Sequence, residues 1–486
     1  MSTESAKKGS VMEYVNIAIV VLLMFGFGYL PPFEPLTQYG MALVGIFFGL
    51  VYGWTVSKSG LAWPSLLGIV ALGFTDFGTV SVAMSKVFAT DTASLLLFAM
   101  LLLGPIMESG LPGVITAKML GSKFCYKKPW NFNFLIVVVL PALAAVMNGF
   151  LLSLFVLPII TAVFTSAGFK KGDKYPVMLT LGFFVIQLLA NCLFPWRGWG
   201  LYCTATFAST SGGYMIDYSK YLILAFAFYI VAGFAYLGLM KLMRCEVEAI
   251  RDLDIAKFLG DNTGKMSKSQ KGVLIGLVSM VVGCILVSFV SGDAGLGLIF
   301  KKLGVYGIMM ITIIAMLLVK VDGKPLSTIE SMAKYVMWDM LLVIVVAMLV
   351  ANCLTGGDTG LSALISQYAV PLLNGRSEIA FLMILAVICL VLTNLFNNMV
   401  VMLVFTAVAG KFYAMGIITN PAAALMIINL CTMLGFYTPG SSGLGAMLHG
   451  AELSTAASVY KYGALALVLC LALIAFVLIP MTMVLF

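Results

Sequence analysis

The sequence predicts an all-α, polytopic membrane protein with eleven transmembrane helices and two re-entrant helical hairpins in two inverted repeats. Three observations predict this fold class. The 486 residues are 62% hydrophobic and only 10% charged, whereas soluble domains carry about 25% charged residues. Two apolar segments are too long for one membrane span and too short for two. Matched polar interruptions also recur at nearly constant spacing in the two halves of the chain.

Apolar runs of suitable length define the spans. The first run, from Val15 to Leu30, has no small-residue cleavage site, so we expect a retained span and not a cleaved signal peptide. The predicted spans cover residues 13–30, 40–57, 61–75, 93–111, 176–210, 219–243, 272–290, 303–320, 337–353, 422–450 and 458–486.

The basic residues set the orientation. With the N-terminus in the cytoplasm and each unusual segment entering and leaving on one side, 21 of the 28 Lys and Arg residues fall inside and six outside. Arg197 lies within a span. This asymmetry is typical of the positive-inside rule, so the net charge of +8 does not indicate nucleic-acid binding. We expect a prokaryotic inner (cytoplasmic) membrane protein whose C-terminus lies outside.

The two unusual segments, 131–168 and 378–412, each contain two apolar stretches separated by a polar turn. Each stretch is about 14–17 residues, or roughly 25 Å of helix, and does not reach across a core of ~30 Å. The turns are "MNG" at 147–149 and "TNLFNNM" at 393–399. Each segment therefore predicts a helical hairpin, the first entering from the cytoplasm and the second from outside.

A broken helix follows each hairpin. Residues 176–210 contain "ANCLFPWRGWG", and residues 422–450 contain "GFYTPGSSGLG", where proline and glycine interrupt a helix. Asn397 follows Asn148 by 249 residues, and Pro439 follows Pro195 by 244. The spacing, with opposite entry sides, predicts an inverted repeat. The expected organisation is an N-terminal segment with the first helix (1–39), a first repeat (40–243), a cytoplasmic linker (244–271) and a second repeat (272–486).

Paired interrupted helices at corresponding places indicate a binding site. Amides at the hairpin tips offer donors to an anion and carbonyl oxygens to a cation. The hydroxyl groups of Thr438, Ser441 and Ser442 lie in the second break. Gly440 allows close approach of the backbone. A single Asn or Thr in a membrane helix is more often a contact between helices. Two matched turns with two matched breaks favour a functional site.

Arg197 has two interpretations. Its guanidinium group suits a bidentate clamp for a carboxylate or sulfate. Alternatively, the span is short, and Arg197 extends to the membrane interface beside Trp196 and Trp199.

Other function classes find little support in the sequence. One histidine, His449, and the lack of a CxxC pair exclude a zinc cluster, so we expect no metal site. No catalytic constellation is visible, so we expect no enzyme. The sequence has no TVGYG-like selectivity filter of the kind that an ion channel uses, which argues against a channel. It also has no matched relay of acidic or histidine side chains, which argues against a proton pump.

The arrangement resembles the divalent anion/sodium symporter (DASS) family of the ion transporter superfamily over nearly the whole chain. The turns "MNGFLLSLFVLP" and "FNNMVVMLVFT" occupy the places of that family's Ser-Asn-Thr tips, and "YTPGSSG" resembles its Thr-Pro-Pro-Asn-like break. In the first repeat, "LFPWRGW" departs from the family's glycine-rich loop. The resemblance implies substrate contacts at Asn148, Gly149, Arg197, Asn397, Asn398, Thr438 and Ser441, and cation contacts at Asn148, Asn397, Thr438 and Gly440.

The resemblance also implies a function. We expect a secondary active transporter for di- or tricarboxylates, working as a homodimer in the lipid bilayer, with 131–243 and 378–486 moving as an elevator. No cofactor is expected apart from Na⁺ as a coupling ion. Because Arg197 would repel Na⁺, sodium symport and sodium-independent exchange stay open. Alternatives are a carrier of an inorganic oxyanion such as sulfate, or an anion channel.

Overall fold

The computed structural model describes residues 3–57, 60–89, 91–146, 149–253, 266–290, 294–354, 358–361, 363–364, 367 and 377–486. Within these ranges the chain is mostly helical, as the predicted fold class requires. The sheet found there is one antiparallel pair of two-residue strands, β1 (Lys320–Val321) and β2 (Lys324–Pro325).

The first part of the chain, from α1 to α7, is built of helices. α1 (Thr3–Val21) continues through a π-helical turn, η1 (Leu22–Gly26), and a 3-10 turn, η2 (Phe27–Tyr29). Two short helices lie where no span was predicted, α4 and α7. The remaining bounds are α2 (Gln38–Val56), α3 (Ala62–Leu72), α4 (Val80–Phe88), α5 (Asp91–Leu101), α6 (Leu103–Glu108) and α7 (Leu111–Leu120).

The next part contains the first predicted hairpin and the first broken helix. Residues 129–145 form a run of short helical pieces, and one longer helix, α10, follows. The bounds are α8 (Pro129–Phe134), η3 (Leu135–Val139), α9 (Leu140–Ala142), η4 (Leu143–Ala145), α10 (Gly149–Ser166), α11 (Lys174–Ala190), α12 (Gly198–Thr210), α13 (Tyr218–Leu242) and η5 (Val247–Ile250).

The last part contains the corresponding elements of the second half. Helices α19 and α20 flank the polar turn, and α21 and α22 flank the second break. The bounds are α14 (Lys268–Val290), α15 (Gly295–Leu318), α16 (Ile329–Lys334), α17 (Trp338–Leu354), α19 (Glu378–Leu395), α20 (Asn398–Ala414), α21 (Pro421–Met433), α22 (Gly443–Gly450), α23 (Ala456–Leu473), η8 (Ile474–Leu478) and α24 (Ile479–Leu485).

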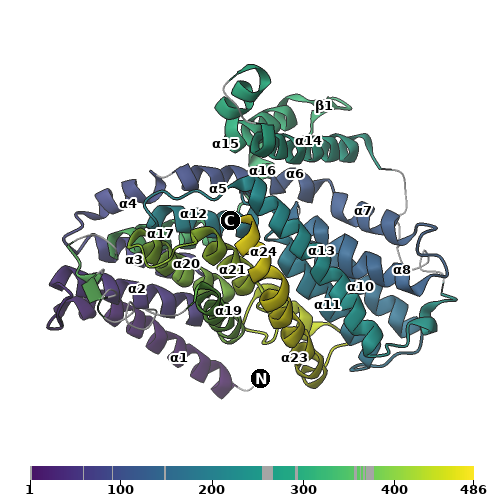
Figure 1. Ribbon diagram of the computed structural model, residues 1–486, viewed down its shortest axis with the longest axis horizontal. Coiled ribbons are helices and arrows are strands. Elements are labelled where there is room, and N and C mark those ends of the chain that lie inside the picture. Colours follow the sequence, from purple (N-terminus) through teal and green to yellow (C-terminus); the bar gives the residue numbers. More distant parts are fainter. Residues whose placement is uncertain are drawn as a thin grey trace.

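Figure 1 shows how these elements are arranged. α2 and α3 lie at one end of the body and α7, α8 and α10 at the other, with α19, α20, α21, α23 and α24 between them. α14 and α15 pack against each other at the edge of the molecule, at the top of the view. The second predicted hairpin, α19 and α20, therefore lies nearer the centre of the body than α8 and α10 of the first.

Seven helices in the described ranges are long and apolar enough to cross a membrane, or eight if the bent pair Val80–Phe88 and Ala93–Glu108 counts as one span. The seven are Val11–Tyr29, Gln38–Val56, Tyr218–Leu242, Lys268–Val290, Gly295–Leu318, Glu378–Leu395 and Ala456–Leu485. Further apolar helices of 10–17 residues lie among them, including α11, α17, α20 and α21. The chain is a multi-pass membrane protein.

Candidate functional site

The first broken helix opens at the centre of the molecule. α11 ends at Ala190 and α12 begins at Gly198. Pro195 has no backbone N–H to continue the helix, and Gly198 has a φ of 55°, which glycine adopts without strain. The seven residues between the helices therefore turn the chain without regular hydrogen bonding.

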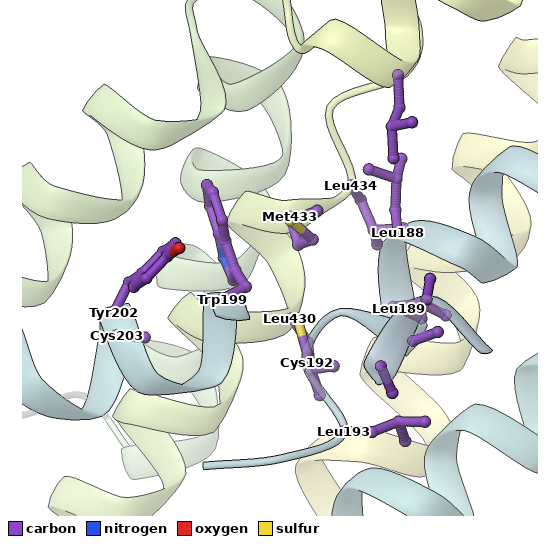
Figure 2. Packing of buried hydrophobic residues seen from close by; sticks show 14 of the residues in the cluster. Leu188, Leu189, Cys192, Leu193, Trp199, Tyr202, Cys203, Leu430, Met433 and Leu434 are labelled. Atoms are coloured by element: carbon purple, nitrogen blue, oxygen red, sulfur yellow. The ribbon is translucent and has the colours of Figure 1, made fainter. Parts of the chain in front are cut away.

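The second broken helix has the same plan. α21 ends at Met433 and α22 begins at Gly443. Ser442 caps α22, because its Oγ accepts a hydrogen bond of 2.9 Å from the backbone N–H of Gly445. Figure 2 shows that the breaks are neighbours, with Leu188, Leu189, Cys192 and Leu193 near Leu430, Met433 and Leu434, and with Trp199 and Tyr202 beside them on α12.

A cavity of about 260 Å³ lies at this junction. Four helices in the described ranges begin on its lining, at Gly149 (α10), Gly198 (α12), Asn398 (α20) and Gly443 (α22). The first turn of a helix has N–H groups without intrahelical partners and carries partial positive charge. The four helix starts therefore favour an anion in this cavity.

Arg197 adds a full positive charge to the same cavity. Its side chain is only 7% exposed, and its Nη1 and Nη2 atoms are buried without a hydrogen-bond partner. The described residues that line the cavity include no aspartate or glutamate. Because the guanidinium group lies inside the protein, the interpretation that Arg197 extends to the membrane interface is wrong. The site therefore contains a buried cation, and no described residue of the lining supplies a counter-ion.

Trp199 offers another donor beside Arg197. Trp199 lines the cavity, is 6% exposed, and its buried Nε1–H has no acceptor. Trp196 is fully buried and also lacks an acceptor for Nε1–H, but it is not part of the lining. Neutral polar groups come from Asn191, Asn398 and Ser442. Because the Ser442 hydroxyl already donates to the carbonyl oxygen of Gly435, the donors of the described lining that lack an acceptor are Arg197 Nη1 and Nη2 and Trp199 Nε1.

Asn394 ties the tip of the second hairpin to the second break. Its Nδ2 donates to the carbonyl oxygens of Leu390 (2.8 Å) and Leu434 (3.0 Å). Its Oδ1 accepts from the N–H groups of Phe436 (3.0 Å) and Tyr437 (2.8 Å). These four bonds use both donors and both lone pairs of the amide. Asn394 therefore holds the loop of the break in place and has no capacity left for a ligand.

Gln187 has a similar role at the start of α10. Its Nε2 donates to the carbonyl oxygen of Gly149. The Oγ of Ser153 lies 3.0 Å from both that carbonyl oxygen and Gln187 Oε1. Asn191 Nδ2 donates to the backbone carbonyl oxygen of Gln187 at 3.0 Å. The first break is thereby fixed to the first hairpin.

The structure separates the predicted site residues into two groups. Gly149, Arg197 and Asn398 line the cavity, whereas Asn397, Thr438, Gly440 and Ser441 do not. Asn397 Oδ1 accepts from the N–H of Met399 (3.0 Å), Thr438 Oγ1 donates to the carbonyl oxygen of Asn394 (2.7 Å), and Ser441 Oγ donates to that of Thr438 (2.6 Å). Gly440 is exposed. Asn148 lies outside the described residues.

Several lining residues were not among the predicted contacts. Asn191, Trp199 and Tyr202 line the cavity close to Arg197 in the sequence, whereas Ser442 was expected as one of the hydroxyl groups of the second break. Asn191 had a usable signal, because it is the first residue after α11 and stands at the start of the interruption. Gln187 stands one turn earlier as an isolated polar residue in an apolar helix.

No model of a known protein family matches the sequence, and no curated protein sequence matches it. Among solved structures, MtrF of Neisseria gonorrhoeae, presented as one of a class of antimetabolite efflux pumps, is similar with a TM-score of 0.56 and 13% sequence identity. The alignment covers 96% of this chain and 94% of MtrF. At this identity the likeness concerns the fold. The chain therefore shares the overall fold of MtrF.

Proposed function

We propose that this chain is a secondary active transporter of small organic anions, and that Arg197 binds the substrate carboxylate. The observation that carries the proposal is the buried guanidinium group of Arg197, which lines the central cavity with two unpartnered nitrogens. A buried cation without a partner is costly, so a protein that keeps one needs an anion to offset that cost. A carboxylate matches the two parallel N–H donors of a guanidinium group.

The charge around Arg197 supports the same class of ligand. The four helix starts at the cavity add partial positive charges, and Trp199 adds an N–H donor. A cation would meet only repulsion from these groups. The di- and tricarboxylates expected from the sequence stay proposed substrates, and sulfate stays an alternative.

We also propose the eleven-span arrangement with two inverted repeats and a relation to the divalent anion/sodium symporters. α10 from the first hairpin contacts α22 from the second broken helix, and α12 from the first broken helix contacts α20 from the second hairpin. Such reciprocal contacts are expected if repeats 40–243 and 272–486 are related by a pseudo-two-fold axis. The cytoplasmic N-terminus, the homodimer and the elevator motion are parts of the same proposal.

Exchange without sodium is the favoured mode of transport within this proposal. The candidate cation contacts Asn397 and Thr438 do not line the cavity, and both make hydrogen bonds to the backbone of the chain. Arg197 already places a positive charge in the cavity. An empty carrier would have to move with this cation unpaired, which is costly, so movement is easier when an anion occupies the site. Sodium symport is the second candidate.

Counterflow in proteoliposomes tests the proposed function. Purified protein is reconstituted in vesicles loaded with unlabelled anion, and the entry of labelled succinate, citrate or sulfate is measured with and without a Na⁺ gradient. We expect saturable accumulation of a labelled carboxylate. Failure to take up or exchange any carboxylate contradicts the proposal. Uptake of sulfate alone supports an oxyanion carrier, and a non-saturating current supports a channel. Counterflow that ignores Na⁺ selects exchange over symport.

A further inference from the structure

One part of the cavity surface is entirely apolar. Its lining comes from α5, α6 and the start of α17, and we name it the apolar wall: Leu96, Ala99, Met100, Leu103, Met337 and Met340. The first four positions follow the spacing i, i+3, i+4 and i+7, which places them on one face of a helical segment. All four are at least 90% buried.

The apolar wall belongs to other elements than the polar side does. Arg197 and Ser442 come from the breaks, Trp199 from α12 and Asn398 from α20, whereas the wall comes from α5, α6 and residues 337–340. α12 contacts both α5 and α17, so the elements that carry the two sides pack directly against each other. A molecule that fills the cavity therefore contacts both the guanidinium group of Arg197 and the hydrocarbon of the apolar wall.

This division limits which carboxylates fit. A carboxylate or hydroxyl group placed against the wall would lose its water and find no side-chain donor there. A methylene group in the same place is removed from water, which strengthens binding by about fourfold. Citrate carries polar groups on every part of its skeleton, so one of them would face the wall.

We propose that the substrate is an amphipathic carboxylate, with its anionic group on Arg197 and an alkyl or aromatic body against the apolar wall. This inference rests on the proposed function and narrows its substrate class. A cavity of about 150 Å³ takes up benzene, so 260 Å³ is enough for an aromatic ring with a carboxylate group. The thioethers of Met100, Met337 and Met340 are flexible and make favourable contacts with aromatic rings. The wall therefore accepts aromatic bodies as well as alkyl chains.

The test measures binding by ligand-dependent thermal stabilisation of the purified protein. Acetate, butyrate and hexanoate form a chain-length series, benzoate and phenylacetate supply a ring, and succinate, citrate and sulfate are the polar comparisons. We expect the Kd to fall by about fourfold per added methylene up to the size limit of the cavity. Benzoate and hexanoate should bind more tightly than citrate, by tenfold or more.

A matched pair of variants assigns the effect to the wall. Met340→Gln places an amide in the wall, and Met340→Leu keeps it apolar. Each added methylene should lower the Kd by a smaller factor in Met340→Gln than in Met340→Leu. An affinity that does not change with chain length, or tighter binding of citrate or sulfate than of benzoate and hexanoate, overturns this inference and leaves the proposed function standing. If no carboxylate binds, both fail.

Discussion

Arg197 is the residue on which the functional argument depends. In a membrane protein a buried, unpaired cation is expensive and marks a functional position more often than a structural one. Arg197 is the N-cap residue of α12, and its backbone is extended (φ −148°, ψ 149°). The positive charge of Arg197 and the partial positive charge of the α12 N-terminus therefore both favour an anion in the cavity. This coincidence makes the position suited to holding an oxyanion.

Trp199 gives a prediction at the residue scale. Trp199→Phe removes the Nε1–H but keeps an aromatic ring, and carboxylate binding should weaken by about tenfold, since hydrogen bonds to charged groups contribute about 1.5–3 kcal/mol. Isothermal titration calorimetry measures the Kd. Trp196→Phe is the matched control, because Trp196 also has an unpartnered N–H but does not line the cavity. Equal losses in the two variants would contradict a direct contact from Trp199.

At the scale of elements, polar side chains hold the hairpins to the broken helices. Asn394 joins α19 to the second break, and Gln187 joins α11 to the start of α10. Both are buried. Each hairpin tip is thus tied to the broken helix of its own half by an amide side chain. The helix starts that face the cavity are positioned by these ties.

Asn394→Ala tests the tie in the second half. The variant leaves the N–H groups of Phe436 and Tyr437 without their acceptor, and we expect a loss of about 3 kcal/mol in the free energy of unfolding. Asn397→Ala is the control, since half-exposed Asn397 caps α20 with one bond and should cost about 1 kcal/mol. Thermal unfolding in detergent compares them. Similar midpoints for the two variants would show that Asn394 has no special structural role.

Gly149→Ala tests the tie in the first half. A Cβ at Gly149 would lie 2.9 Å from Gln187 Nε2 and would displace the amide from its carbonyl acceptor. We expect a lower melting temperature, equivalent to about 1–2 kcal/mol. Gly238→Ala, in α13, is the control, because a Cβ there meets nothing within 4 Å and a helix gains about 0.5–1 kcal/mol from alanine. A neutral Gly149→Ala variant would refute the proposed packing.

At the scale of the whole molecule, the sequence predicts the positions of the helices and breaks better than it predicts which residues contact one another. The polar turn of the second hairpin separates α19 and α20 at Leu395 and Asn398, close to the interruption that the amides mark. Proline and glycine likewise mark both breaks. These signals are local, because backbone geometry depends on neighbouring residues.

The contacts in the cavity were harder to anticipate. Asn397, Thr438 and Ser441 resemble ligands in the sequence, but they cap helices and bond the loop, which only the three-dimensional arrangement reveals. The apolar wall was missed because Leu96 or Met340 in a hydrophobic helix looks the same whether it faces lipid, the core or a cavity. The hydropathy of a side chain measures how favourably it leaves water, and it does not show whether the side chain then packs against lipid, protein or a ligand.

The most direct measurement of the central claim is the affinity for a carboxylate of the wild type, Arg197→Lys and Arg197→Met, determined by calorimetry with benzoate and succinate as probes. Arg197→Met removes the charge and should weaken binding by at least a hundredfold, because the carboxylate then loses its buried partner. Arg197→Lys keeps the charge but loses the bidentate fork, and about a tenfold loss is expected. Thermal unfolding confirms that the variants fold. Binding by folded Arg197→Met as tight as that of the wild type would contradict the account.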